Sequence, residues 1–229
     1  MSTRASADSG VHVLIPVKHL ARAKSRLAPR LEAVERKLLA LAMLEDTLRA
    51  ATASPLVGSI TVVTPDESAA RRAHACGVAV LAEEALPAVA PALGPLNAAL
   101  DAAARQVRAN STPSSLMVLQ ADLPALRPEE LTAAIAQAAG RRALVADYSG
   151  IGTTTLIVPG PRAELTPRFG PWSAREHERG GAVPLVGDWP GLRSDVDTPG
   201  DLRRVHRLGV GPATTALLAA LDDSDWNTA

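Results

Sequence analysis

The sequence predicts a single α/β domain whose central sheet is mostly parallel and is flanked by helices. Short apolar segments rich in β-branched residues alternate along the chain with segments of helical periodicity. This alternation is typical of parallel sheets whose two faces are both covered by helices. No long polar linker divides the 229 residues, a length at which one domain can bury a sizeable core.

Six apolar segments predict strands because they are short, β-branched and bounded by polar or turn residues. They cover residues 11–17, 59–65, 78–82, 115–122, 143–147 and 153–159. Between them, the apolar spacing from Val34 to Leu48 predicts one helix, and Asp66 is placed to cap a second, alanine-rich helix. A third helix is expected from Gly94 to about residue 108.

The second half of the chain is less regular, and we expect its later strands to include an antiparallel excursion. The predicted domain spans residues 11–221. Polar segments at 1–10 and 222–229 are expected to be disordered tails.

The equal numbers of positive and negative side chains argue against a polyanion as the partner. The chain carries 24 basic and 24 acidic side chains, whereas coating a polyanion needs an excess of positive charge. It has too few aromatic residues to stack successive bases, and no apolar run reaches the roughly 18 residues that span a bilayer. We therefore expect a cytoplasmic protein with no nucleic-acid or membrane partner, and a small anionic ligand stays compatible with zero net charge.

A basic loop follows the first predicted strand. It contains Lys18, Lys24 and Arg26, although only three of the 24 cationic side chains are lysines. Ligands of open α/β sheets bind beyond the carboxyl ends of the strands, and lysine acts as a compact point charge beside phosphate. The loop is therefore a candidate phosphate site; the alternative is an ordinary solvated loop. It contains neither a dinucleotide-binding glycine motif nor a P-loop.

Two further segments carry carboxylates that are candidate ligands. Asp122 follows the strand at 115–122, and Asp195 and Asp197 flank Val196 in an extended segment. Alternate residues of such a segment point to one side, so the pair can face one site while Val196 faces the core. Mg²⁺ prefers carboxylate ligands together with water and phosphate oxygens. The preferred interpretation is a three-carboxylate magnesium site, although Asp122 could also serve as a turn or helix cap.

Thr198, Pro199 and Asp201 are expected to cap the next helix, as N-cap, first helical residue and capping-box acid. Helix capping therefore accounts for these three residues and leaves the Asp195 and Asp197 pair unexplained.

Neutral groups suited to a small anion lie in the second half. Gly152 can let a ligand approach the backbone, Thr153 can donate its hydroxyl, and Ser173, just after Gly170, is placed to cap a helix at 174–179. Glycines and threonines also build ordinary turns, and Ser173 could serve only as a cap. Asn97, which opens another helix, could read a base edge or act as a cap.

The remaining reactive residue types are weaker candidates. The histidines lack metal-ligand spacing, and only His177, close to Ser173, is a candidate site residue. Cys76 is the single cysteine, so no intramolecular disulfide or cysteine-based zinc cluster is expected, and a small buried residue is the favoured interpretation.

Five motifs in register resemble those of the guanylyltransferases of coenzyme F-420 biosynthesis. They are Ile15–Lys18 with Ala23–Leu27, Gln120–Pro124, Gly152–Thr154, Phe169–Gly170 with Ser173 and His177, and Asp195–Pro199. The resemblance covers about residues 11–210. It implies a single-domain, Rossmann-like fold of the nucleotide-diphospho-sugar transferase (GT-A-like) type. It also implies transfer of the guanylyl group of GTP to phosphoenolpyruvate or 2-phospho-L-lactate, with release of pyrophosphate.

The same resemblance implies roles for individual residues. Asp122, Asp195 and Asp197 would hold Mg²⁺; Thr153, Gly170 and Ser173 would contact phosphoenolpyruvate; Lys18, Lys24, Arg26 and Asn97 would bind the nucleotide. The catalytic set would be the three aspartates with Lys18 and Lys24. One departure is that related nucleotidyltransferases outside this family have a glycine-rich loop where this chain has residues 18–26, so side-chain cations must do more of the phosphate binding.

Phosphoenolpyruvate is the favoured acceptor, because a composition rich in alanine and arginine is similar to that of actinobacterial relatives. The alternatives are 2-phospho-L-lactate, a sugar phosphate or molybdenum cofactor as the acceptor of a related nucleotidyltransferase, or a silent nucleotide-binding subunit. A downstream transferase that consumes the guanylylated product is an expected functional partner.

Overall fold

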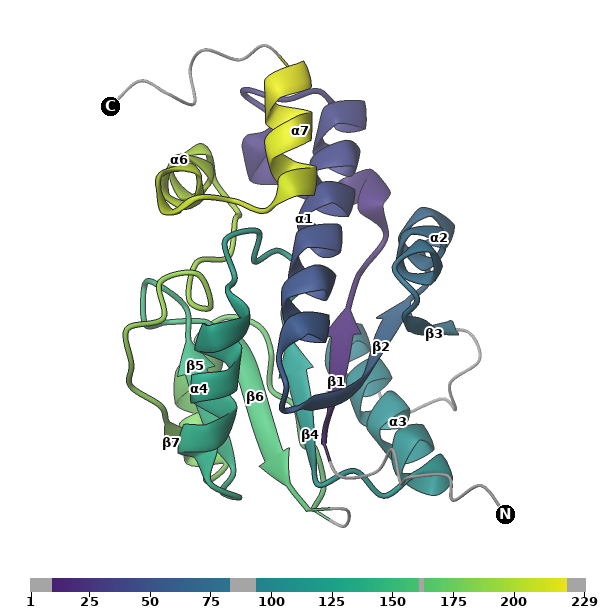
Figure 1. Ribbon diagram of the computed structural model, residues 1–229, viewed down its shortest axis with the longest axis vertical. Coiled ribbons are helices and arrows are strands. Elements are labelled where there is room, and N and C mark those ends of the chain that lie inside the picture. Colours follow the sequence, from purple (N-terminus) through teal and green to yellow (C-terminus); the bar gives the residue numbers. More distant parts are fainter. Residues whose placement is uncertain (1–9, 83–93, 161–162, 222–229) are drawn as a thin grey trace.

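The computed structural model describes residues 10–82, 94–160 and 163–221 (Figure 1). Their centre is a seven-stranded sheet with the strand order β3-β2-β1-β4-β6-β5-β7. The strands are β1 (Val11–Pro16), β2 (Val57–Thr64), β3 (Ala79–Ala82), β4 (Ser115–Leu119), β5 (Ala143–Ala146), β6 (Thr153–Pro159) and β7 (Val183–Pro184). The predicted tails lie outside these residues apart from Gly10, so the domain boundaries stay predictions.

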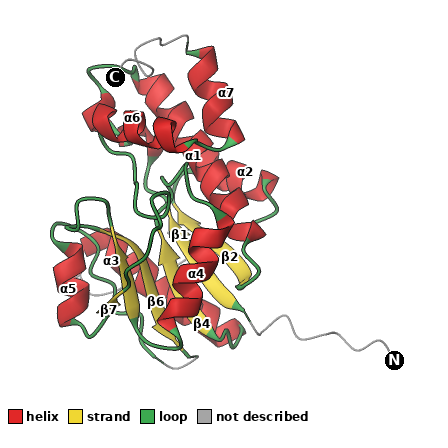
Figure 2. Cartoon of the chain, turned by 60° about the vertical axis from the view of Figure 1, so that its left-hand side comes forward, coloured by secondary structure: helices red, strands yellow, loops and turns green. Residues whose placement is uncertain are grey.

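Helices cover both faces of the sheet, as predicted (Figure 2). They are α1 (Ala33–Ala53), α2 (Glu67–Ala75), α3 (Gly94–Asn110), α4 (Pro128–Ala138), α5 (Ser173–Arg179), α6 (Pro199–Leu208) and α7 (Pro212–Ala220). Apolar residues of α1, α2 and α4 pack on one face of the sheet, and those of α3 and α5 pack on the other. No helix in the described ranges is long and apolar enough to cross a membrane.

The strand directions confirm the predicted antiparallel excursion. β1, β2, β3 and β4 are parallel, whereas β6 runs antiparallel to both of its neighbours, β4 and β5. Strand β1 is buried along its whole length, which explains its mainly apolar sequence; its one polar residue, His12, is hydrogen-bonded to Thr61 and Ser59 of β2. The chain builds β2 and β3 on one side of β1 and then returns to place β4 on the other side. The strand order therefore reverses between β1 and β4, where open α/β sheets bind their ligands.

Two predicted helix starts are confirmed. The Asp66 carboxylate accepts hydrogen bonds from the amides of Ser68 and Ala69 at the start of α2. At the start of α6, Thr198 and Asp201 form the predicted capping box, with Pro199 as the first helical residue.

Three elements were not predicted, although α4 and α7 each begin with a proline, which is one local signal of a helix start. Helix α4 has Arg127 at its N-cap without a side-chain cap bond, and α7 has Gly211. The α7 cap comes instead from Asp46 on α1, whose buried carboxylate accepts hydrogen bonds from the amides of Ala213 at 3.0 Å and Thr214 at 2.8 Å. Strand β7 has only two residues, which is too short for a recognisable pattern.

The Asp46 cap predicts a measurable contribution to stability. Replacing Asp46 by alanine leaves two amides of α7 without their acceptor, and we expect the free energy of unfolding to fall by about 1–3 kcal/mol. Urea denaturation followed by circular dichroism measures this change. The control is Glu67→Ala, which removes only an exposed ion pair with Arg71 and should cost less than about 1 kcal/mol. Equal losses in the two variants would contradict the assignment.

Candidate functional site

The carboxyl ends of β1 and β4 lie side by side where the strand order reverses. A cavity of about 240 Å³ opens there, and Lys18, Lys24 and Asp122 are among its lining residues. Lys18 and Lys24 come from the loop after β1, and Asp122 follows β4. The fold therefore brings the predicted phosphate loop and the first predicted metal ligand to one cavity.

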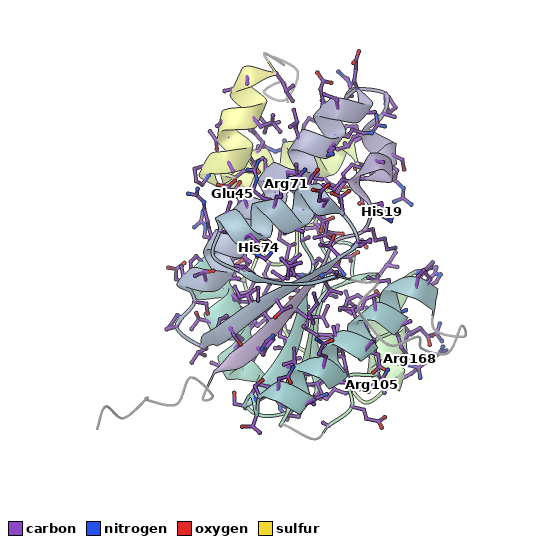
Figure 3. All side chains as sticks on the ribbon, turned by 90° about the vertical axis from the view of Figure 1, so that its right-hand side faces the viewer. His19, Glu45, Arg71, His74, Arg105 and Arg168 are labelled. Atoms are coloured by element: carbon purple, nitrogen blue, oxygen red, sulfur yellow. The ribbon has the colours of Figure 1, made fainter. Side chains whose placement is uncertain are left out.

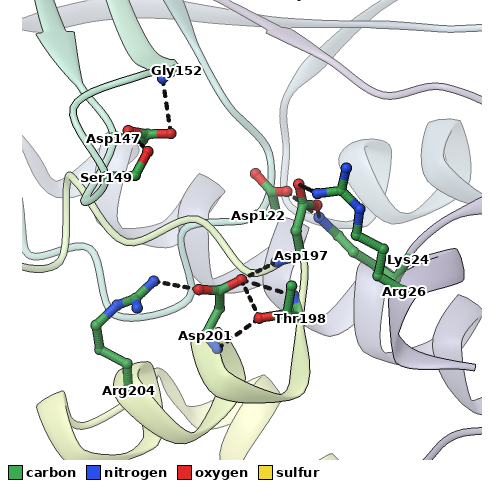
Figure 4. A network of polar contacts seen from close by, with 10 residues as sticks. All are labelled: Lys24, Arg26, Asp122, Asp147, Ser149, Gly152, Asp197, Thr198, Asp201 and Arg204. Atoms are coloured by element: carbon green, nitrogen blue, oxygen red, sulfur yellow. Dashed lines mark hydrogen bonds and ion pairs between the residues drawn. The ribbon is translucent and has the colours of Figure 1, made fainter. Parts of the chain in front are cut away.

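The loop after β1 is held in place by apolar side chains and by one distant carboxylate. It forms two short 3-10 turns, Leu20–Arg22 and Ser25–Leu27, in which Leu20 and Leu27 are buried. The Leu20 amide donates a hydrogen bond to Asp66 at 2.9 Å, so the acid that caps α2 also anchors this loop. Lys24 lies between the two turns in the left-handed region, at φ 52°, and this backbone geometry sends its side chain toward the carboxylates (Figure 4).

Hydrogen bonds attach the segment before α6 to helix α4 and to the residues at the carboxyl ends of β5 and β4. Glu130 of α4 accepts hydrogen bonds from the amides of Gly191 and Leu192, at 3.1 and 2.8 Å. The Arg193 guanidinium donates to the carbonyl oxygens that end β5 and begin the following turn, and the Val196 amide donates to the Asp122 carbonyl at 3.2 Å. Val196 is fully buried, as predicted for the residue between Asp195 and Asp197.

One ammonium group links the carboxylates that come from these segments. The Lys24 Nζ donates to Asp122 Oδ2 and, at 3.0 Å, to Asp197 Oδ1 (Figure 4). Burial alone would lower the pKa of Lys24, but attraction to Asp122 and Asp197 raises it above its usual range. Arg26 adds a second, more exposed cation at 3.8 Å from Asp197. Lys24 therefore stays protonated at neutral pH.

Asp195 is the most perturbed carboxyl of the cluster. Burial, and then repulsion from Asp122, Asp197 and Asp147, raise its pKa from 3.8 to about 7, against the opposing attraction of Lys24. Negative charge therefore exceeds positive charge at this point of the structure. A cation that approached the cluster would lower the pKa of Asp195 by the same Coulomb interaction.

The three carboxylates are of the chemical type that binds a divalent cation, but they are not arranged as the ligands of one ion. Asp122 Oδ1 is buried and has no hydrogen-bond partner, which leaves one carboxylate oxygen available. Among the described residues, however, no three acidic, histidine or cysteine side chains are arranged as ligands of one metal ion. Lys24 instead bridges Asp122 and Asp197. The three-carboxylate magnesium site stays a prediction.

The predicted acceptor residues meet beside this cluster. The turn between β5 and β6 is shaped by Asp147, whose carboxylate accepts hydrogen bonds from the amides of Ile151 and Gly152, both at 3.0 Å. A Cβ atom on Gly152 would lie 2.5 Å from Asp147 Oδ2, so the turn requires glycine at that position. The Ile151 carbonyl then accepts a hydrogen bond from the Ala174 amide at 3.1 Å, which ties the turn to the start of α5.

These contacts bring Thr153, Gly170 and Ser173 into one region. The structure corrects the prediction that Ser173 is an N-cap. Ser173 is the first residue of α5, and Trp172, in the left-handed region at φ 61°, occupies the N-cap without a side-chain cap bond. The N-cap prediction for Ser173 was therefore wrong by one residue, because the left-handed Trp172 turns the chain into the helix without a capping side chain. Ser173 is buried, and its amide donates to the Gly170 carbonyl at 3.2 Å.

Asn97 holds the loop that leads to Gly170. Its side-chain amide donates to the Phe169 carbonyl at 3.0 Å, and its oxygen accepts from the Phe169 amide at 2.8 Å. The role of Asn97 in nucleotide binding stays a prediction, and its position in this structure is that of a clamp between α3 and the loop.

His177 is the histidine that lies in this region, at 3.0 Å from Thr153 Oγ1. His74 is exposed on another part of the surface (Figure 3), whereas His19 is exposed and is among the residues that line the cavity between β1 and β4. Cys76 is only partly buried, so the expectation of a buried small residue was too strong.

Three residues of the site were missed in the sequence, namely Asp147, Glu130 and Arg193. Asp147 could have been found, because it follows β5 as Asp122 follows β4. Glu130 and Arg193 act through backbone groups more than 40 residues away, and no local pattern records such contacts.

The raised pKa of Asp195 predicts a pH-dependent stability. Because the folded protein holds this proton up to about pH 7 and the unfolded chain releases it near 3.8, the free energy of unfolding falls as pH rises through this window. Asp195→Asn removes the charge, and we expect it to stabilise the metal-free protein at pH 8 by about 1–3 kcal/mol and to change little at pH 4. Urea denaturation with a chelator present measures both values. Asp188→Asn, at an exposed position, is the control, and no gain at pH 8 for Asp195→Asn would contradict the prediction.

Two solved structures have a fold similar to that of this chain. A putative nucleotide-diphospho-sugar transferase from Desulfovibrio desulfuricans superposes with a TM-score of 0.66 at 16% identity, over 93% of this chain and 96% of that one. A 4-diphosphocytidyl-2C-methyl-D-erythritol synthase superposes with a TM-score of 0.57 at 15% identity, over 87% and 97% of the two chains. The predicted nucleotide-diphospho-sugar transferase fold is thus confirmed.

Proteins found by sequence comparison have a much higher identity to this chain than these solved structures have. The chain is 49% identical to the phosphoenolpyruvate guanylyltransferase of Rhodococcus erythropolis, over 95% of this chain and all of that protein. It is 52% identical to the protein of the same name from Nocardia farcinica, over 95% and 93% of the two chains. Residues 11–203 also match the family described as "Guanylyl transferase CofC like". Because this match spans most of the sequence and the relatives are about half identical over nearly their whole length, the chain belongs to the CofC-like guanylyltransferases.

Proposed function

We propose that the protein transfers the guanylyl group of GTP to phosphoenolpyruvate and releases pyrophosphate, as a step of coenzyme F-420 biosynthesis. The observation that carries this proposal is the meeting of a basic loop with acidic residues at the switch point of the sheet, in a chain about half identical to phosphoenolpyruvate guanylyltransferases. The choice of acceptor rests on the names of those relatives. We expect the reaction to be cytoplasmic and its product to pass to a downstream transferase.

The cavity between β1 and β4 is the proposed place of the GTP phosphates. Lys18 is exposed at its rim, Lys24 lies deeper among the carboxylates, and Arg26 extends from the same loop. These three cations would offset the charge of the triphosphate in the absence of a glycine-rich loop. Because the pKa of Lys24 is raised by Asp122 and Asp197, its charge is available at every physiological pH.

Asp122, Asp195 and Asp197 are the proposed magnesium ligands. The unpartnered oxygen of Asp122 and the excess of negative charge around Asp195 support this assignment. When bound there, Mg²⁺ would neutralise and orient the reacting phosphates.

The proposed chemistry needs no general base on the protein. The phosphate of the acceptor is already ionised at neutral pH, so it can attack the α-phosphorus of GTP as pyrophosphate leaves in line. Both reactants are anions, and the task of the protein is to hold them together against their repulsion. Thr153, Gly170 and Ser173 would hold the acceptor while the basic loop holds the nucleotide, so that catalysis consists of orientation and electrostatic stabilisation.

Pyrophosphate release tests this function directly. The purified protein is incubated with GTP, Mg²⁺ and either phosphoenolpyruvate or 2-phospho-L-lactate, in the presence of the enzyme that accepts the guanylylated product. We expect release that depends on phosphoenolpyruvate. Release only with 2-phospho-L-lactate, or only with a sugar phosphate or molybdenum cofactor as acceptor, would replace the proposed substrate. No release with any acceptor would leave a nucleotide-binding subunit.

Removal of the acidic ligands should abolish turnover and leave the fold intact. For Asp122→Ala and Asp195→Ala we expect the rate of pyrophosphate release to fall by about 100-fold or more, because the charge that holds the metal is lost. Circular dichroism checks that each variant is folded. Asp188→Ala, at an exposed position, should keep wild-type turnover. Near-normal turnover of either active-site variant at saturating Mg²⁺ would refute the assignment of the ligands.

A further inference from the structure

A buried histidine connects two of the predicted acceptor-binding segments. His177 of α5 is 3% exposed, and both of its ring nitrogens have partners. Nε2 accepts a hydrogen bond from the Arg168 amide at 2.9 Å, and Nδ1 lies 3.0 Å from Thr153 Oγ1. The Phe169 ring packs edge-on against the imidazole, at 4.9 Å between centroids. The ring therefore has one defined orientation between β6 and the loop before Gly170.

The hydrogen bond from Arg168 determines which ring nitrogen carries the proton. A backbone amide can only donate, so Nε2 must be unprotonated. Burial and the nearby charges of Arg142 and Arg168 lower the pKa of His177 to about 4, which keeps the ring neutral at pH 7. The one remaining proton is on Nδ1. By this hydrogen-bond network, Nδ1 donates to Thr153 Oγ1 and Thr153 is the acceptor of that bond.

This assignment sets the direction of the Thr153 hydroxyl. A hydroxyl has one hydrogen to donate, and the lone pair that faces His177 is already used. Thr153 is 6% exposed, and no described residue accepts a hydrogen bond from it. A buried hydroxyl whose hydrogen lacks an acceptor is costly, and a ligand oxygen would supply the missing acceptor.

The surroundings indicate an anion as the source of that oxygen. Ser173 lies one helical turn before His177 on the same face of α5, and Gly170 and the Gly152 turn adjoin it. The Arg168 side chain lines a separate surface cavity with Arg105 of α3 (Figure 3), and its positive charge, like that of Arg142, acts on His177 without a hydrogen bond to the ring. The Gly152 amide already donates to Asp147, so Thr153 offers its hydroxyl as a neutral donor in a region where the charges of Arg142 and Arg168 favour an anionic oxygen.

We propose that His177 is a positioning residue that fixes the Thr153 hydroxyl as a hydrogen-bond donor to an anionic oxygen of the acceptor substrate. This inference rests on the proposed function, because it takes phosphoenolpyruvate as the acceptor. His177 does not touch the reacting atoms. It acts through Thr153 and, by its bond to Arg168, on the loop that presents Gly170.

Two variants separate the two hydrogen bonds of the imidazole. In His177→Asn the side-chain amide can replace Nδ1 as donor to Thr153, whereas in His177→Gln it can replace Nε2 as acceptor from Arg168. We expect the KM for phosphoenolpyruvate to rise about tenfold or more in His177→Gln and in Thr153→Val, and to change less than about threefold in His177→Asn. The KM for GTP should stay within about twofold in each variant. Thr153→Ser keeps the hydroxyl, so its KM for phosphoenolpyruvate should rise less than that of Thr153→Val.

A double variant tests whether His177 acts through Thr153. If it does, Thr153→Val combined with His177→Gln should be no worse in acceptor KM than Thr153→Val alone. A purely structural role for His177 predicts additive losses, equal effects of the Asn and Gln replacements, and changes in the KM for GTP. Any of these results would overturn the inference.

Nitrogen-15 NMR of the histidine-labelled wild-type protein tests the inference without relying on the folding of any variant. We expect His177 to show a protonated Nδ1 and an unprotonated Nε2 at pH 7, and the opposite tautomer would overturn the proposal. The two levels of failure are distinct. If the wild-type protein releases no pyrophosphate with phosphoenolpyruvate, the proposed function is wrong. If the protein is active but His177→Gln has an unchanged KM for phosphoenolpyruvate, only the role of His177 is wrong.

Discussion

The candidate site depends on a cluster of aspartates whose mutual repulsion the rest of the fold must overcome. Four aspartates from three separate segments are close enough to influence one another, and a single buried ammonium, that of Lys24, bridges two of them. Such an arrangement is unfavourable unless the surrounding fold enforces it. Removal of Lys24 would leave the repulsion between Asp122 and Asp197 without its bridging cation, so the loop after β1 and the segment before α6 hold their positions partly through Lys24. The proposed nucleotide and metal sites share it.

The fold holds these segments in place with buried or partly buried carboxylates that accept hydrogen bonds from backbone amides. Asp66 fixes the loop after β1, Glu130 fixes the segment before α6, and Asp46 fixes the start of α7. Each of these acids satisfies amides that have no partner in regular structure, and each joins elements distant in sequence. The acidic residues of the chain thus divide into those that brace the fold and those that face the cavity.

Local patterns were sufficient to predict six of the seven strands, because segments such as β1 and β4 are short and mainly apolar. The starts of α2 and α6 were predicted from their capping side chains. The same patterns placed Lys24, Asp122 and Asp197 at strand ends or helix starts, and the fold brings them together. Helices α4 and α7 could not be predicted from caps, since neither carries one of its own. The predicted N-cap at Ser173 was wrong by one residue, because a tryptophan in the left-handed region is not a recognisable sequence signal for a helix start. The Lys24 bridge between two carboxylates is a tertiary contact that no spacing records.

The reversal of β6 has a consequence for the polarity of the active edge. Strands β1 and β4 reach this edge with their carboxyl ends, after which come cations and carboxylates, whereas β6 reaches it with its first residue, Thr153. The edge therefore presents ionic groups over one part and neutral hydrogen-bond donors over the adjacent part. A sheet of uniformly parallel strands would repeat the first kind of group along its whole edge. One inverted strand thus gives two anions different chemical neighbours at adjoining positions.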